Sequence, residues 1–192
     1  LFPYTTLFRS EAIDISHTGG TNVVASLVVF INGKPARREY RKYKIKSFSG
    51  QDDFRAMAEV IERRVTRLQK ENREMPDLLL IDGGKGQLSA VTTVLKEKGL
   101  ENQPVISLAK RLEEVYLPGL AAAQTIPKSS PSLMLLQRIR DEAHRFAITF
   151  HKQIRTKNTI TSVLDSVPGI GKKRRRELLK KFRSIDEIKC AS

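Results

Sequence analysis

The chain has 192 residues, of which 40% are hydrophobic, and it carries a formal net charge of +14. Because domains usually hold roughly 100 to 200 residues, this length suits one domain with a small appendage. The longest apolar run, "VVASLVVFI", is far shorter than the roughly 20 residues of a membrane span, so we expect no membrane partner. The single cysteine, Cys190, excludes an intramolecular disulfide and a cysteine-based zinc site. The positive charge favours a polyanionic partner, and nucleic acid is the first to test.

The opening segment, "LFPYTTLFRS", has no initiator Met, no signal-peptide core and no cleavage pattern. It is similar to translated sequencing-adapter sequence, so we predict that residues 1–10 are foreign and that the chain is a fragment of a longer protein. Residues 11–155 are predicted to form the main domain, and residues 156–192 a small helical segment. The lone cysteine is typical of a reducing compartment.

Three strand-like runs open the main domain: "EAIDIS", "TNVVASLVVF" and "ARREYRKYKIK". The "NGK" between the second and third runs contains an Asn-Gly pair, which suits a two-residue hairpin turn, so we expect consecutive antiparallel strands. A helix follows over "FRAMAEVIERRVTRLQK", with Asp52 or Asp53 as its N-cap. Its apolar residues fall on one helical stripe, made of Phe54, Met57, Val60, Ile61, Val65 and Leu68.

The next elements alternate between strand and helix. The apolar runs "DLLLIDGG" and "PVISLA" lack polar alternation and indicate buried strands, joined by a helix from about Gln87 to Lys98 that Gly99 ends. Such an order implies a parallel crossover. The segments "EEVYLPG" and "AAQTIPK" fit either a short hairpin or a loop, and a long helix is expected from Ser130 and Pro131 through His151. The whole order is that of an α/β, ribonuclease H-like mixed sheet, with three antiparallel strands and then parallel strands, flanked by helices.

Two aspartates stand where packing explains them poorly. Asp14 lies inside "AIDIS", and Asp82 ends "LLLID" before two glycines. A buried carboxylate is costly unless it is paired or bound to a cation. Carboxylates at one edge of the sheet would hold one or two Mg²⁺ or Mn²⁺ ions, which clamp the attacking and leaving oxygens of a phosphodiester. A turn-forming role is the alternative for Asp82.

The letters Asp-Glu-Ala-His within "LLQRIRDEAHRFAITFH" are also the ATPase box of nucleic-acid motor proteins. That box needs a preceding buried strand and a phosphate loop, whereas this segment is an amphipathic helix and the chain contains no G-x-x-x-x-G-K-[ST]. The motor interpretation is therefore rejected. Helical spacing lets His144 reach the sheet edge as a third metal ligand, and a surface or core histidine is the alternative.

The tail "SVLDSVPGIGKKRRRELLKKF" combines a helix, a glycine-rich turn and a second helix that starts with five basic residues. Glycines let a backbone approach a phosphate, and the free amides of the second helix point at it. This pattern predicts a small all-α helix-hairpin-helix that binds the DNA backbone through Gly169, Gly171, Lys172, Lys173 and Arg174. The alternative is a solvated basic hairpin that docks on the main domain.

With these motifs together, the chain resembles the C-terminal half of the UvrC family, the incision subunit of bacterial nucleotide excision repair. The matching text includes "DISHTGGTNVVASLVVF", "PDLLLIDGGKGQLSA" and "LLQRIRDEAHRFAITFHKQIR". The resemblance implies a cytoplasmic, divalent-metal-dependent endonuclease domain that cuts on the 5′ side of a lesion in double-stranded DNA, in a complex with UvrB. It also implies an Asp14, Asp82 and His144 site, with Asp53 as a further acidic position that competes with its helix-cap role.

Lys85 and Arg145 are candidates for contacts to the DNA backbone, or else solvated charges. The family's N-terminal nuclease domain, its UvrB-contacting segment and its second helix-hairpin-helix do not occur in this sequence, so we expect weaker DNA affinity and no lesion targeting. A different class of function is a non-catalytic, sequence-independent DNA-binding module. Metal separates the two hypotheses, because binding survives chelation and cleavage does not.

Overall fold

The computed structural model describes residues 8–18, 22–47, 52–109, 114–165, 167, 169–182, 187–188 and 190–191. The chain forms two compact units, Leu1–Ala147 and Ile148–Ser192. The division between them lies earlier than the expected boundary at residue 155 and falls inside one long helix, α3 (Pro131–Asp165). Each unit is described by itself below.

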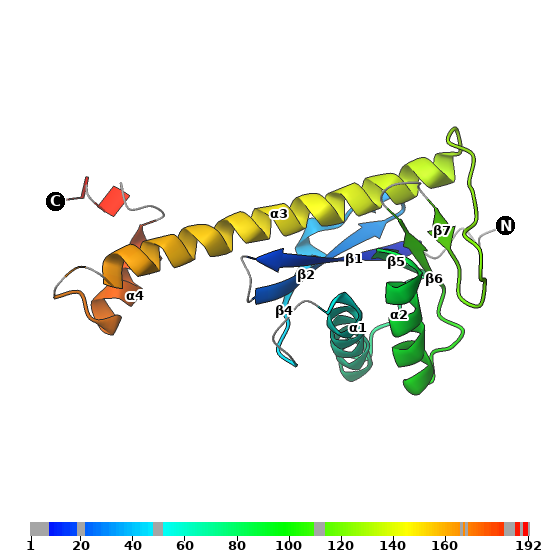
Figure 1. Cartoon of the computed structure of the whole chain (residues 1–192), viewed down its shortest axis with the longest axis horizontal. Helices are drawn as coiled ribbons and strands as arrows, with labels where there is room; N and C mark the ends of the chain where they lie inside the picture. Colours follow the sequence, from blue (N-terminus) through cyan, green and yellow to red (C-terminus); the bar gives the residue numbers. More distant parts are fainter. Residues whose placement is uncertain are drawn as a thin grey trace. The chain divides into compact units, whose positions relative to one another are not determined.

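The first unit is built on a mixed sheet whose strands run in the order β3-β2-β1-β5-β6-β7, with β4 also paired to β2 (Figure 1). The strands are β1 (Arg9–Thr18), β2 (Asn22–Ile31), β3 (Lys34–Pro35), β4 (Arg41–Lys44), β5 (Leu78–Asp82), β6 (Val105–Leu108) and β7 (Val115–Tyr116). β1, β5 and β6 are parallel neighbours, whereas β2 is antiparallel to β1, β3 and β4. The predicted change from antiparallel to parallel pairing is confirmed.

Strand β1 begins at Arg9, so Arg9 and Ser10 belong to the sheet, although residues 1–10 were predicted to be foreign. Arg9 pairs with Ile31, and its backbone N–H donates to Asp77 Oδ2 at 2.6 Å. Residues 1–7 lie outside the described part of the chain.

The third strand, expected over residues 36–46, forms only in part, as β4. The Asn-Gly turn forms as expected, since Asn32 and Gly33 both have positive φ, 48° and 73°. However, β3 ends at Pro35, and a 3₁₀ turn, Arg37–Glu39, precedes β4. Proline has no N–H to give to the ladder, which is a physical reason for the pairing to stop there.

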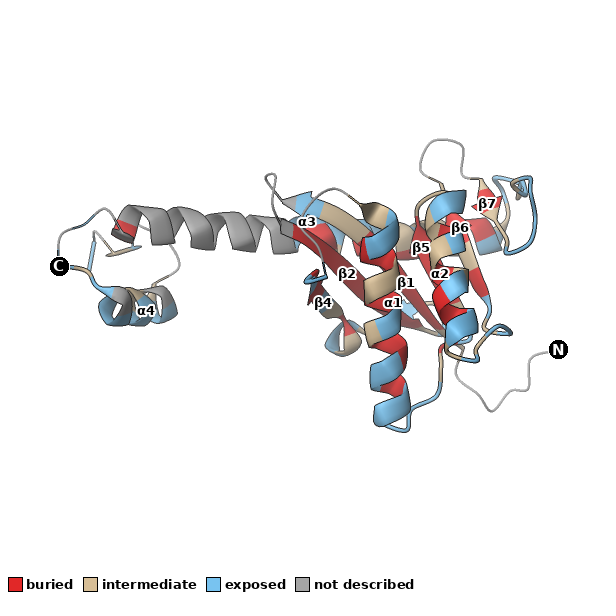
Figure 2. Ribbon diagram, turned by 60° about the horizontal axis from the view of Figure 1, so that its bottom comes forward, coloured by how far each residue is buried: buried red, intermediate tan, exposed pale blue. Residues whose placement is uncertain are grey.

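Two helices, α1 (Asp53–Lys70) and α2 (Lys85–Glu97), cover one face of the sheet, and the N-terminal part of α3 covers the other (Figures 1 and 2). On α1 the predicted stripe is buried from Met57 to Leu68, but Phe54 is 55% exposed. Asp52 is the N-cap of this helix, because its Oδ1 accepts the N–H of Arg55 at 3.0 Å. Gly99, with φ of 70°, follows α2 as predicted.

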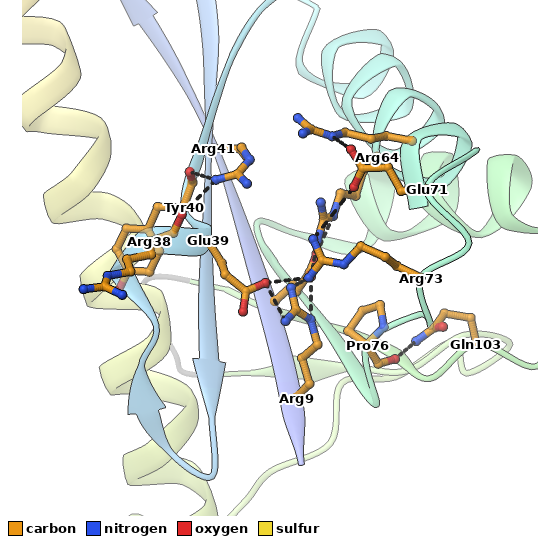
Figure 3. Close-up of polar contacts among 12 residues, drawn as sticks. Arg9, Arg38, Glu39, Tyr40, Arg41, Arg64, Glu71, Arg73, Pro76 and Gln103 are labelled. Carbon is orange, nitrogen blue, oxygen red and sulfur yellow. Dashed lines mark hydrogen bonds and ion pairs between the residues drawn. The ribbon is translucent and has the colours of Figure 1, made fainter. Parts of the chain in front are cut away.

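A buried ion pair joins β1 to α1. Arg64 Nε donates to Glu11 Oε2 at 2.8 Å, and the two residues are 2% and 0% exposed. Burial alone would lower the pKa of Arg64, but the Glu11 carboxylate outweighs it and raises that pKa. Arg9 adds a second contact to Glu11, and it also meets Glu39, to which Arg73 binds (Figure 3). The apolar stripe predicted for α1 does not include Arg64, so the burial of this residue was not predicted.

The remaining segments complete the unit. Residues 114–124 form the short hairpin alternative, because β7 pairs antiparallel with β6 and Val115 exchanges both backbone hydrogen bonds with Gln124. α3 continues past His151 to Asp165, so the separate helix expected before the glycine-rich turn is the end of α3. Among the residues that the structure describes, no helix combines the length and apolar character needed to cross a membrane.

Candidate metal centre

The strand register brings the two aspartates side by side. β1 and β5 pair in parallel from Ser10 opposite Leu78 to Ile13 opposite Ile81, and the next residues in this register are Asp14 and Asp82. Adjacent strands in register point their paired side chains to the same face of the sheet. Both residues are buried, with 2% and 5% of their surface exposed.

His144 reaches the same place from α3. Ser26 on β2 lies opposite Asp14, and its Oγ donates to the carbonyl of Ala143 at 3.0 Å, which holds this turn of the helix over the strand pair. The neighbouring His144 has its Nδ1 3.3 Å from Asp14 Oδ2. Its side chain is 49% exposed, so the histidine forms the open side of a site whose carboxylates lie inside.

Together the three side chains form a candidate metal centre. One ligand atom from each of Asp14, Asp82 and His144 lies within 4.8 Å of the others, and this is the one such cluster found among the described residues. Ser16 Oγ lies 3.3 Å from Asp14 Oδ2 and donates to it. Two buried carboxylates this close repel each other unless a cation lies between them. Carboxylate oxygens with one imidazole nitrogen are a donor set that suits Mg²⁺ or Mn²⁺.

Asp53 does not join this cluster. Its Oδ1 lies 2.6 Å from Nε2 of His17, the residue before the last residue of β1. The N-cap of α1 is Asp52, so Asp53 is not the cap, and its expected catalytic role stays a prediction. Sequence reasoning missed His17, although its position three residues after Asp14, on the opposite face of β1, was readable from strand alternation.

The two cations predicted to touch DNA from the first unit have contacts of their own. Arg145 donates to Glu142 through Nε and Nη2, at 2.6 and 2.7 Å, and Tyr40 Oη donates to the same carboxylate at 3.0 Å. Arg145 holds the pKa of Glu142 below its ordinary value, and burial together with Glu142 raises the pKa of Tyr40. Lys85, the first residue of α2, donates from Nζ to the carbonyl of Ala121 at 3.2 Å.

The second unit contains the glycine-rich turn and α4 (Lys172–Lys181). Gly169 has φ of 84°, a conformation that favours glycine, and Gly171 is the N-cap of α4. Arg174 Nη1 donates to the carbonyl of Gly169 at 3.0 Å, which ties the first turn of the helix to the preceding loop. Lys173 and Arg174 are exposed, and the side chain of Lys172 lies outside the described residues.

The mixed sheet and its two helical layers are those of a ribonuclease H-like domain. The chain belongs to the UvrC family, because the model of the UvrC RNase H endonuclease domain matches residues 4–148. UvrABC system protein C of Dehalococcoides mccartyi (strain CBDB1) is 51% identical over 189 residues, which are 96% of this chain and 31% of that protein. For the protein of the same name from Synechococcus sp. (strain JA-2-3B'a(2-13)) the identity is 52%, over 96% of this chain and 30% of that protein.

The chain therefore spans less than a third of the length of these relatives. Among solved structures, human endonuclease V is 24% identical with a TM-score of 0.41, over 60% of this chain and 51% of that one. Endonuclease V of Ciona intestinalis, bound to DNA containing inosine, is 21% identical with a TM-score of 0.41, over 59% and 50% of the two chains. Both matches cover only part of each chain.

Proposed function

We propose that this chain is a divalent-metal-dependent DNA endonuclease domain of nucleotide excision repair, and that it makes the incision 5′ to a lesion. The observation that carries the proposal is the cluster of Asp14, Asp82 and His144, whose ligand atoms lie within 4.8 Å of one another. Membership in the UvrC RNase H endonuclease domain family supports the chemistry and the DNA substrate.

In this mechanism Asp14 and Asp82 would hold Mg²⁺ or Mn²⁺, and His144 would complete the ligand set. One or two ions held there would polarise the phosphodiester and stabilise its attacking and leaving oxygens. Ser16 donates to Asp14 and keeps one carboxylate oxygen in place, while Ser26 fixes the helical turn that carries His144. Because the carboxylates are buried and His144 is half exposed, the substrate phosphate must enter past the histidine.

DNA binding is assigned to several basic positions. Exposed Lys173 and Arg174 begin a helix that follows a glycine-rich turn, which supports a helix-hairpin-helix around Gly169 and Gly171, with Lys172 as a further cation. In the first unit, Lys85 lies three residues after Asp82 and is exposed, so its charge can serve a phosphate beside the site. Arg145 is half exposed, so its guanidinium can contact a phosphate while it still pairs with Glu142.

The experiment that tests the proposal is nicking of supercoiled plasmid with Mn²⁺ or Mg²⁺, with and without EDTA. Asp14→Asn and His144→Ala are the site variants, and Asp141→Asn is the matched control, because Asp141 is an acid on the same helix with 68% of its side chain exposed. We expect EDTA and both site variants to abolish nicking, while the control retains it.

Circular dichroism establishes that each variant is folded. If the folded parent binds DNA and never nicks it, the nuclease proposal fails for this chain and the non-catalytic DNA-binding module takes its place. The name of the relatives, UvrABC system protein C, supports a further proposal that the longer protein acts with UvrB on damaged double-stranded DNA. Adding UvrB-bound lesion DNA to the assay tests that step, because position-specific 5′ cutting is then expected.

A further inference from the structure

Phe54 is the one member of the predicted apolar stripe of α1 that the fold leaves uncovered. It is 55% exposed, whereas Met57 and Ile61 on the same stripe are 0% exposed. A large aromatic ring that stays exposed does not gain the hydrophobic free energy that the buried residues of this helix gain by packing. The ring is therefore available for a role other than packing in the core.

The ring is held in place by the start of α2. A side chain at Gly86 would put its Cβ 2.5 Å from Cε1 and 2.8 Å from Cζ of Phe54, so the absence of a side chain there makes room for the ring. Asp53, the preceding residue, is bound to His17 at 2.6 Å, which ties this end of α1 to β1. The ring is thus both exposed and fixed.

Phe54 belongs to the end of the sheet at which the candidate metal centre lies. Gly86, against which the ring packs, follows Asp82 by four residues at the start of α2. His17, which holds Asp53, is on the same strand as Asp14, although on the opposite face. Both helices begin at the edge of the sheet where Asp14 and Asp82 lie, so a DNA strand that crosses this edge can contact both the centre and the ring.

We propose that the exposed face of Phe54 stacks on an unpaired nucleobase of the DNA strand that is held at the Asp14, Asp82 and His144 site. This inference rests on the proposed function, and it specifies how the protein contacts the bases of the DNA substrate. A flat aromatic face accepts any base, because every base has a π face. The exposed cation Arg55, the next residue of α1, suits an adjoining phosphate.

A groove between α1 and α2 continues from Phe54. Beyond Arg55, which also lines it, its charged side chains are Glu59, Glu62 and Glu97, and three carboxylates repel a phosphate backbone. The proposed strand therefore runs from the ring toward the metal centre and not along this groove. The same acids would suit a basic peptide, so a protein partner at Phe54 is the outcome that the test has to separate.

Tryptophan fluorescence gives a direct test, because the chain contains no Trp. Phe54→Trp places a single indole at the proposed stacking position, and Met134→Trp is the matched control, since Met134 is 49% exposed on α3. Each protein is titrated, in EDTA and at low salt, with a short duplex that carries a few unpaired thymines. We expect strong quenching of the Phe54→Trp signal and little change in the control.

Affinity supplies the second readout. Phe54→Ala should weaken binding of the bubbled duplex about fivefold or more, which is the low end for one base–aromatic stack, and Phe54→Leu should lose nearly as much because it keeps apolar bulk without a π face. Equal fluorescence changes at both Trp positions, unaltered affinity of Phe54→Ala, or no DNA binding at all would each overturn the inference. Since EDTA prevents cleavage in these titrations, quenching without plasmid nicking would sink the nuclease proposal while the stacking surface stands.

Discussion

Replacing Arg64 with Met should be among the most destabilising single changes in this chain. The substitution keeps most of the apolar stem and removes the guanidinium, leaving the fully buried Glu11 carboxylate without its main partner. Removing one member of a buried pair typically costs about 3–5 kcal/mol. Arg9 Nη2 remains 2.7 Å from Glu11 Oε1, so we expect the lower end, about 3 kcal/mol.

Urea unfolding followed by circular dichroism measures this loss. Arg67→Met is the matched control, because Arg67 lies on the same helix but pairs with Glu71 at the surface, with side chains 48% and 36% exposed. Exposed pairs of this kind contribute well under about 1 kcal/mol. The double replacement Glu11→Leu with Arg64→Met should recover most of the lost stability, since it removes the orphaned charge. The reasoning is refuted if Arg64→Met costs no more than the control.

Three further outcomes are expected. Asp82→Asn should raise the Tm in EDTA by a few degrees, because it relieves repulsion from Asp14. In scanning fluorimetry, Mn²⁺ should raise the Tm of the parent and not that of the variant. A parent Tm that does not change with Mn²⁺ would contradict the metal site. Burial alone would raise the pKa of Glu59, but hydrogen bonds from residues 46–47 and from Arg63 outweigh it and lower that pKa. This carboxylate therefore stabilises the fold fully above its unfolded pKa of about 4.3, and the stabilisation is lost as the pH falls. Glu59→Gln should therefore lose about 1 kcal/mol at neutral pH and nothing in acid, by urea unfolding at each pH. Gly33→Ala should cost about 1 kcal/mol because φ is 73°, whereas Gly84→Ala, with φ of −98° and no nearby atom, should cost less.

The approach of the two aspartates in the candidate metal centre could be predicted from sequence. A parallel crossover puts the first strand and the strand after α1 side by side, and mid-strand Asp14 and strand-ending Asp82 then fall in one register. Helical spacing only allowed His144 to reach the sheet edge. The full set of three residues was implied by the resemblance to the UvrC family.

Side-chain exceptions to those periods could not be predicted. Arg64 interrupts an apolar stripe, and its burial depends on Glu11, 53 residues away, which strand alternation alone does not pair with it. Phe54 continues the stripe, yet it is exposed, whereas Met57 in the same turn of α1 is fully buried. The break after Pro35 depended on which strand lies at the edge. These features are set by contacts between distant segments, which a single sequence does not display.

The ligands of the candidate centre come from parts of the chain that are far apart, and His144 follows Asp14 by 130 residues. No early, locally folded piece of the chain can hold all three. The set becomes complete only when α3 packs against β2 through Ser26. A nascent or partly unfolded copy therefore lacks the full set of three candidate ligands.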